Sequence, residues 1–172
     1  AMWKIAPALA MGNSIIVKPA TNTPLGTLKL AELAIEAGVP PGVFNVITGP
    51  GGVVGEALVT HPQVDKVAFT GSTEVGKKIM SLAAEKNKKV TLELGGKSPS
   101  IVLPDVDFET AIPGILFGVF FHSGQVCESG TRLLVHDSIY EEVVEKLAAA
   151  SSKIKLGNPM DPATGMGPVV SK

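Results

Sequence analysis

The sequence predicts an α/β fold built around a parallel sheet. Short runs rich in apolar and β-branched residues alternate with helical patterns of about a dozen residues along most of the chain. Glycine-containing turns join strand ends to helix starts, most clearly at Gly71-Ser72. A glycine doublet, Gly95-Gly96, is the best candidate for a domain boundary. We therefore expect one domain over residues 1–95 and the first part of a second over residues 96–172.

Strands of the first domain are expected at residues 14–17, 43–47, 64–69 and 89–94. The chain opens within a helical pattern that Gly12-Asn13 ends, because glycine or asparagine commonly follows a last helical turn. A second helix follows the first strand, with the Thr23 hydroxyl as its expected cap and a proline at its first position. Two further helices are expected over residues 53–60 and 73–85, each after a glycine turn.

The second domain is expected to contain strands at residues 100–103 and 132–135. Asp107 is the expected cap of a helix that runs to about residue 121. Ser138 and Glu141 have the spacing of a capping box, which predicts a helix beginning there. Glycines and prolines dominate residues 156–168, so we expect a loop in that segment.

Composition excludes several classes of protein. The chain is 45% hydrophobic and 18% charged with a formal charge of −1, which predicts a folded core and no basic surface for nucleic acid. No apolar run approaches the roughly 18 residues that span a bilayer. The 3 histidines show no metal-ligand spacing, so no metal site is expected. A single cysteine cannot form an internal disulfide, which favours the cytoplasm.

Cys127 is the candidate nucleophile, since it follows the flexible segment Gly124-Gln125-Val126. Glu93 lies 34 positions upstream beside glycines, and such a carboxylate can activate water after a thiolate has attacked a carbonyl. Two plainer readings remain open. A free cysteine often packs as a small apolar group, and Glu93 can pair with Lys97 or Lys89 at the surface. His122 is a candidate base for the cysteine on sequence proximity alone.

The turn at Gly71-Ser72 is the candidate phosphate site. It exposes backbone N–H groups at a helix N-terminus, where the helix dipole favours an anion. A serine-capped helix with no ligand explains the same residues. The turn at residues 49–52 has an equivalent position, but its Pro50 lacks a donor. Lys18 follows the first strand, where it can hold ribose hydroxyls or a phosphate, or extend into solvent.

Three segments together resemble the aldehyde dehydrogenase superfamily: residues 67–76 (VAFTGSTEVG), 92–99 (LELGGKSP) and 124–127 (GQVC). The match is collinear over nearly the whole chain and includes Trp3-Lys4, Lys18-Pro19 and Gly157-Asn158-Pro159. The resemblance implies the Rossmann-like parallel sheet of a cofactor domain, followed by the first part of an α/β catalytic domain. It also implies an internal piece of a longer subunit.

The resemblance implies an NAD(P)-dependent oxidation of an aldehyde to a carboxylic acid. Cys127 is then the nucleophile that forms a thiohemiacetal and later a thioester, with its backbone N–H in the oxyanion hole. Glu93 activates the hydrolytic water, and Lys4 assists proton movement near that base. The residues implied to contact NAD or NADP are Lys18, Thr21, Gly52, Gly71, Ser72, Thr73, Glu74, Val75, Gly76 and Leu94.

Two positions depart from the pattern of many family members. Thr21 stands where many NAD-preferring members have a glutamate that repels a 2′-phosphate, so we expect NADP to be accepted as well as NAD. Glu128 adds a charge directly after the nucleophile, where it either raises the pKa of Cys127 or lines the substrate tunnel.

Other activities of the family remain alternatives. One is a coenzyme A-acylating enzyme, which needs no water-activating base, so the presence of Glu93 argues against it. Another is a catalytically silent binding or structural protein, which need not keep Cys127. The partners implied are a small aldehyde and, for the longer protein, further copies in a homodimer or homotetramer. Family segments that complete the oxyanion hole and grip the nicotinamide ribose are missing, so we expect residues 1–172 alone to be inactive.

Overall fold

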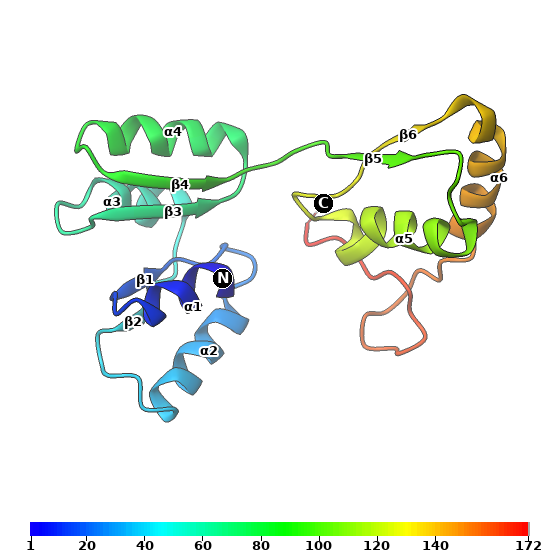
Figure 1. The fold of residues 1–172 in the computed structure, drawn as a ribbon. Helices are drawn as coiled ribbons and strands as arrows, with labels where there is room; N and C mark the ends of the chain where they lie inside the picture. The colour runs from blue at the N-terminus through cyan, green and yellow to red at the C-terminus, as the bar shows by residue number, and fades with distance from the viewer. Residues whose placement is uncertain (172) are drawn as a thin grey trace. The chain divides into compact units, whose positions relative to one another are not determined.

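The structure is a computed structural model that describes residues 1–171. The fold is α/β, as expected, and its strands pair in parallel (Figure 1). The chain divides into two compact units, one over Ala1–Glu93 and the other from Leu94 onward, so the division falls beside the predicted Gly95-Gly96 boundary.

The first unit contains two parallel strand pairs. Strand β1 (Ile15–Val17) pairs with β2 (Phe44–Val46), and β3 (Lys66–Thr70) pairs with β4 (Lys89–Glu93). The helices of this unit are α1 (Met2–Ala10), α2 (Leu25–Glu36), α3 (Glu56–Thr60) and α4 (Thr73–Ala84). A π-helical turn over Gly51–Gly55 leads into α3, so helical structure begins earlier than the predicted residue 53.

The core of the first unit lies between the β3–β4 pair and two helices. Side chains alternate between exposed and inward along both strands, with Val67, Phe69, Val90 and Leu92 inward. These four pack against a buried cluster from α3 and α4 that comprises Val59, Ile79 and Ala83. Figure 1 shows α4 running along the strand pair. The opposite, exposed positions include Thr70 and Glu93, so both end their strands outside this core.

In the first unit, the C-terminal end of α1 has the geometry that the sequence predicts, but the start of α2 does not. Gly12 has a φ of 74°, and Asn13 N–H donates to the Ala8 carbonyl at 3.0 Å, which is the glycine-ended geometry expected from the sequence. The Thr23 cap is wrong. Pro24 is helical, as expected for a first helical position, with φ −81° and ψ −26°, but no side chain caps α2. Thr23 instead closes a turn by donating from its N–H to the Ala20 carbonyl.

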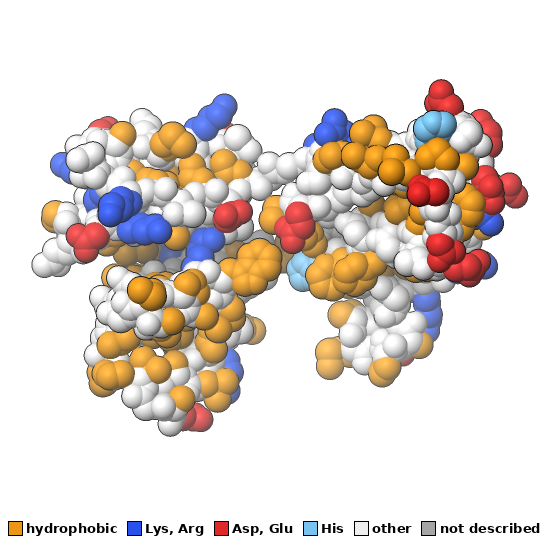
Figure 2. Space-filling model, viewed as in Figure 1, with side chains coloured by type: hydrophobic (Ala, Val, Ile, Leu, Met, Phe, Trp, Pro, Cys, Tyr) orange, Lys and Arg blue, Asp and Glu red, His pale blue; other side chains and the backbone are white. Residues whose placement is uncertain are grey.

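Helix α2 presents apolar side chains to the surface. None of its residues is buried, and Leu25 and Ile35 are 79% and 67% exposed. Figure 2 shows apolar side chains gathered on the first unit over α1 and α2.

The second unit contains one parallel strand pair, β5 (Pro99–Val102) with β6 (Arg132–Val135). Its helices are α5 (Phe108–Phe120) and α6 (Tyr140–Ser151), with short 3₁₀ turns at Phe121–Gly124 and Asp137–Ile139. Asp107 caps α5, as predicted, because its carboxylate accepts from Glu109 N–H.

The capping box predicted for Ser138 and Glu141 is wrong. The Ser138 hydroxyl lies 2.9 Å from His136 Nδ1, and that nitrogen accepts from Ser138 N–H. The serine is therefore held by the preceding histidine, and α6 begins after the 3₁₀ turn without a side-chain cap. Residues 156–168 form the expected loop, apart from one bridge between Leu156 and Met166.

Candidate active site

The predicted site residues Lys4 and Glu93 both lie at the carboxyl ends of β3 and β4 in the first unit. Thr70 and Glu93 are partners in the parallel register, and Gly71 N–H donates to the Glu93 carbonyl at 3.0 Å. Lys4, on α1, donates from Nζ to Thr70 Oγ1 at 2.7 Å. The expected base and the expected proton-handling lysine thus share one strand end, with Thr70 between them. Glu93 itself is exposed, so water can reach its carboxylate.

Lys18 is held at the end of β1 rather than extended into solvent. It follows β1, and its Nζ donates to the carbonyls of Pro19, at 2.7 Å, and Gly49, at 3.2 Å. Its side-chain carbons also lie about 4.0 Å from the position that a Cβ on Gly55 would take. The lysine therefore ties the end of β1 to the turn after β2, which contains the predicted Gly52.

The turn at Gly71-Ser72 has the geometry of a capped helix start. Ser72 Oγ accepts from Val75 N–H at 3.3 Å, and its backbone is extended, with φ −70° and ψ 151°. A hydroxyl that accepts one bond still has its own proton to donate. Gly71 is required for a local reason, since a Cβ there would lie 2.4 Å from the Phe69 ring. Both descriptions of this turn, a serine-capped helix and an exposed donor site, therefore apply to the same residues.

The remaining predicted cofactor residues fall into exposed and buried groups. Thr21, Gly52, Thr73, Glu74 and Val75 are exposed. Gly76 is buried within α4. Leu94 is half-buried and lies in the second unit, directly after Glu93.

The cysteine loop has an unusual backbone. His122, Ser123 and Gly124 have φ values of 53°, 57° and 73°, so three consecutive residues occupy the left-handed region. Only glycine adopts this region without strain, and each non-glycine residue there costs about 1–3 kcal/mol. Side chains hold the loop in place: Ser123 Oγ donates to the Gly167 carbonyl at 3.0 Å, and Gln125 Oε1 accepts from Val170 N–H at 3.0 Å.

Cys127 is exposed, and its partner is Glu128 rather than His122. The thiol Sγ donates to Glu128 Oε2 at 2.7 Å. This hydrogen bond, followed by desolvation and by the negative charge of Glu128, raises the pKa of the Cys127 thiol above its usual range. The same bond lowers the pKa of Glu128. Of the two roles left open for Glu128, the structure therefore supports the effect on the thiol.

The donor set around the cysteine also includes its own backbone. Within residues 1–171, Cys127 N–H donates to no other residue, and its contact with its own sulfur is one of the smaller influences on the pKa of the thiol. An N–H beside the sulfur is the kind of donor that an oxyanion hole requires. Glu93 and Cys127 belong to different units, so their pairing remains a prediction.

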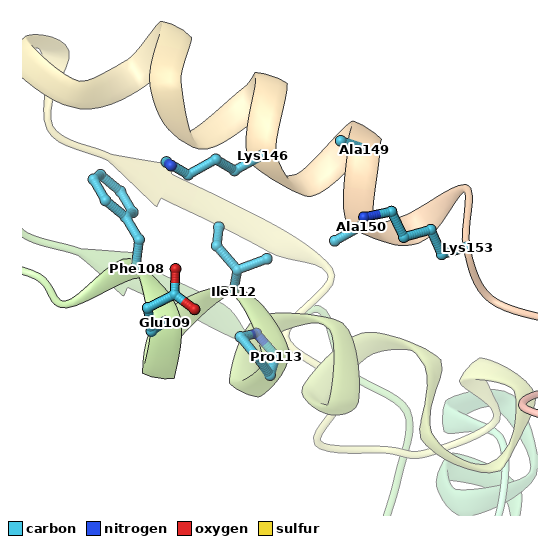
Figure 3. Close-up of a pocket in the computed structure, with 8 residues that line it drawn as sticks. All are labelled: Phe108, Glu109, Ile112, Pro113, Lys146, Ala149, Ala150 and Lys153. Atoms are coloured by element: carbon cyan, nitrogen blue, oxygen red, sulfur yellow. The ribbon is translucent and has the colours of Figure 1, made fainter.

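A groove between α5 and α6 is separate from the cysteine loop (Figure 3). It contains residues from the start of α5, whereas Cys127 follows the end of that helix. Its floor includes the buried Ile112, and Lys146 Nζ lies 5.1 Å from the centre of the Phe108 ring. These contacts pack α5 against α6. Across the described part of the chain, no group of three His, Cys, Asp or Glu side chains is arranged to hold a metal ion.

The chain matches the model of the aldehyde dehydrogenase family over residues 1–172. The chain belongs to this family. It is 56% identical to phenylacetaldehyde dehydrogenase of Pseudomonas fluorescens over 172 residues, which are 100% of this chain and 34% of that protein. It is 54% identical to betaine aldehyde dehydrogenase of Mesorhizobium japonicum, with 99% of this chain and 35% of the relative aligned.

Solved structures of the family have the same fold. Betaine aldehyde dehydrogenase from Staphylococcus aureus in complex with NAD+ superposes with a TM-score of 0.93 at 49% identity, covering 98% of this chain and 34% of that one. An NADP-dependent enzyme from E. coli gives a TM-score of 0.94 at 48% identity, covering 97% and 35%. The chain therefore spans about a third of the length of the family members that it matches.

Two residues to which the sequence analysis gave no role contact the predicted site residues or their loop. Thr70 holds Lys4, and its signal was a hydroxyl at the last position of a strand before a glycine turn. Gln125 bridges the cysteine loop, with its Nε2 donating to the His122 carbonyl and its Oε1 accepting from Val170 N–H. A glutamine inside a glycine-containing loop gave no indication of that distant partner.

Proposed function

We propose that the full-length protein carrying this sequence oxidises an aldehyde to a carboxylic acid, with NAD+ or NADP+ as the hydride acceptor. The observation that supports it most directly is the exposed Cys127 sulfur, in a loop held by hydrogen bonds to Gly167 and Val170. Membership of the aldehyde dehydrogenase family supports the same reaction. The relatives named for betaine aldehyde and phenylacetaldehyde supply the first two substrates to test.

The residues of the first unit fit a dinucleotide. The N-terminus of the 12-residue α4 is exposed and offers backbone N–H groups and the Ser72 hydroxyl to a phosphate. Lys18 lies at the end of β1, half-buried and bonded to two carbonyls, and its ammonium is a donor of the kind that ribose hydroxyls accept. Ligands of open parallel sheets bind at this carboxyl edge. Bound NAD(P)+ supplies the two-electron acceptor for the hydride that leaves the substrate carbon.

The chemistry of the chain's own residues begins with Cys127. Its thiolate adds to the aldehyde carbon, and the oxygen that gains the electron pair is stabilised by Cys127 N–H. Loss of hydride from this adduct leaves a thioester on the sulfur. Glu93 then takes a proton from water as the water attacks the thioester, and the Cys127 thiolate leaves as the carboxylic acid forms. Lys4, held at Thr70 beside the strand end of Glu93, assists the removal of that proton.

The decisive experiment follows NAD(P)H formation by the full-length protein with each aldehyde and compares it with Cys127→Ser. We expect the serine variant to lose turnover while still binding the cofactor. Mass spectrometry of the wild type, quenched during turnover, should show an acyl adduct on Cys127. Turnover retained by Cys127→Ser sinks the proposal. Adding coenzyme A is a further arm, since a coenzyme A-dependent rise in rate would favour the acylating alternative.

Thr21 supports acceptance of both cofactors. It is exposed in the turn that follows Lys18, and it carries no charge that would repel a 2′-phosphate. We therefore propose kcat/KM values for NAD+ and NADP+ that lie within about two orders of magnitude of each other, equivalent to about 2.7 kcal/mol. Thr21→Glu should reduce kcat/KM for NADP+ selectively. A wild type that prefers NAD+ by far more than this, or a variant that loses both cofactors equally, contradicts the idea.

Two further properties of the full-length protein are proposed, one from the habit of its family and one from its single cysteine. We propose that it assembles as a homodimer or homotetramer, which light scattering of the purified protein will test. We also propose a cytoplasmic location, which fractionation of the source cells will test. No helix within residues 1–171 has both the length and the apolar character needed to cross a bilayer.

A further inference from the structure

The carboxylate next to the nucleophile is a direct hydrogen-bond partner of the reacting atom. Glu128 Oε2 lies 2.7 Å from Cys127 Sγ, well within hydrogen-bond reach of the thiol. Thiol and carboxylate are both exposed, so neither is forced into this contact by burial. A thiol donates to a carboxylate only while it carries its proton. The contact therefore belongs to the neutral, unreactive form of Cys127.

The backbone on both sides of the pair restricts where it can move. Upstream, Gln125 is joined to Val170 and to the His122 carbonyl. Downstream, Ser129 is only 4% exposed, and its N–H donates to the Val126 carbonyl at 3.2 Å. Gly130 N–H donates to the Gly118 carbonyl at the end of α5. Because both flanks are anchored, release of the thiol requires rotation of the two side chains rather than movement of the loop.

The charged groups on the surrounding segments do not compete for the sulfur. Arg132 donates from Nε to the Lys97 carbonyl, so its guanidinium is engaged with the segment that leads into β5. The Cys127 carbonyl oxygen lies 3.3 Å from the position that a Cβ on Gly96 would take, and Gly96 carries no charge. His122 lies at the start of the loop with its ring 6.4 Å from that of Phe121. Within the second unit as described, Glu128 is the charged group that bonds the thiol.

We propose that Glu128 is a positioning residue that holds Cys127 in a resting, protonated state and releases it for attack only when its carboxylate turns away. This inference rests on the proposed function, since it takes Cys127 as the attacking atom. The raised pKa of the Cys127 thiol is consistent with the contact. Glu128 does not touch the substrate in this role. It acts through the sulfur by opposing formation of a second negative charge beside its own.

The test measures the reactivity of the thiol without requiring turnover. Iodoacetamide reacts with the thiolate: sulfur bonds to the methylene carbon, iodide leaves with the electrons of the carbon–iodine bond, and the thiol proton passes to solvent. The rate of carboxamidomethylation of Cys127, followed by mass spectrometry across the pH range, gives the midpoint of thiol ionisation. The full-length protein is compared with Glu128→Gln and Glu128→Ser, which remove the charge, and with Glu128→Asp, which retains it.

We expect the midpoint to fall by about one pH unit in both neutral variants. At neutral pH the thiolate fraction then rises about tenfold and its intrinsic nucleophilicity falls about threefold, so alkylation becomes about threefold faster. Glu128→Asp should remain within a few tenths of a unit of the wild type. In the pH profile of kcat/KM, the limb that reports thiol ionisation should move to lower pH in the neutral variants. It should move by the same amount as the midpoint of the alkylation profile.

The matched control is Glu109→Gln, which makes the same change at an exposed carboxylate near the start of α5, about 16 Å along the helix from its last residue. Its alkylation profile should coincide with that of the wild type. An unchanged midpoint in both neutral variants overturns the role of Glu128, and so does an equal shift in the control. Failure of the proposed function is seen separately, as a wild-type protein whose Cys127 is alkylated normally but which oxidises no aldehyde.

Discussion

Lys4 donates a hydrogen bond to Thr70, the residue that lies opposite Glu93 in the parallel β3–β4 pair. A helix at the start of the chain is thereby joined to a strand end 66 positions later. The contact fixes the ammonium beside the backbone position of the proposed base. Three residues that are far apart in sequence thus meet at the carboxyl edge of the strands, and this is the group to which we assign the proposed proton transfer.

Replacement of Thr70 by valine should impair this group without changing the shape of the strand. Lys4 loses its acceptor, and a hydrogen bond of this kind contributes about 1 kcal/mol, so we expect kcat of the full-length protein to fall about fivefold with KM little changed. Thr70→Ser, which keeps the hydroxyl, should restore most of the rate. Thr91→Val is the control, because Thr91, on β4, lies on the same exposed face of the strand pair as Thr70. A rate for Thr70→Val equal to that of Thr91→Val contradicts the role of Thr70.

Replacement of Glu93 by glutamine should slow hydrolysis of the thioester while leaving its formation intact. General-base assistance is typically worth about 10²–10⁴-fold, so steady-state turnover should fall within that range. Rapid-quench kinetics should show a burst of NAD(P)H with a stoichiometry near one per site, followed by a slow phase. Glu85→Gln, at an exposed carboxylate after α4, should behave as the wild type. A variant that loses the burst as well would place Glu93 in the first step instead.

Ser72 is predicted to contribute to stability through its cap of α4. Ser72→Ala removes the acceptor for Val75 N–H and should destabilise the protein by about 1 kcal/mol, seen as a lower midpoint of thermal unfolding. Ser81→Ala lies within the same helix, where alanine has the higher helix propensity, so its midpoint should stay the same or rise. Equal midpoints for the two variants would contradict the role of the cap.

Asp107 gives a stability contribution that depends on pH. Its carboxylate accepts from the Thr110 hydroxyl at 2.6 Å and from Glu109 N–H at 3.2 Å, and these bonds lower the pKa of Asp107, with the Thr110 bond as the larger cause. A lowered pKa in the folded chain means that the contribution is complete above the ordinary aspartate pKa. The contribution is lost as the pH falls through the lowered value.

We therefore expect Asp107→Ala to lower the unfolding midpoint at about pH 7, and this deficit to shrink steadily as the pH falls below the ordinary aspartate pKa of about 4. Thermal unfolding followed by circular dichroism across this range will measure the difference. Asp105→Ala, at an exposed turn position before α5, is the comparison and should show no such dependence on pH. A deficit for Asp107→Ala that stays constant with pH would show that the cap does not depend on the charge.

Much of the fold could be predicted because its signals are local. Gly12 and Gly38 end helices in the left-handed conformation, and the alternation along β3 and β4 identifies the face that packs on α4. The two wrong caps, Thr23 and Ser138, fail for a related reason. Their hydroxyls have suitable spacing, but a turn to Ala20 and the ring of His136 determine the local backbone. The spacing of residues along the chain shows which hydrogen bonds can form, but not which of two competing hydrogen bonds is the stronger.

The site was predicted in its residue types but not in its contacts. Glycine turns and strand ends identify Ser72, Lys18 and Glu93, because the geometry of a strand–turn–helix junction is set by neighbouring residues. The partners that hold these side chains are distant in sequence. Lys18 bonds to Gly49 across 31 positions and Lys4 to Thr70 across 66, and no local pattern encodes either pairing.

The left-handed turn at residues 122–124 makes the nucleophile dependent on a remote stretch of chain. Its strained conformation is held by the bonds from Ser123 and Gln125 to Gly167 and Val170, which lie more than 40 positions downstream. Truncation before Gly167 should therefore let the loop relax, even though every residue of the proposed mechanism is retained. The geometry of the cysteine loop thus depends on a coil segment remote in sequence, and insertions that displace that segment should disturb the loop as changes beside the sulfur do.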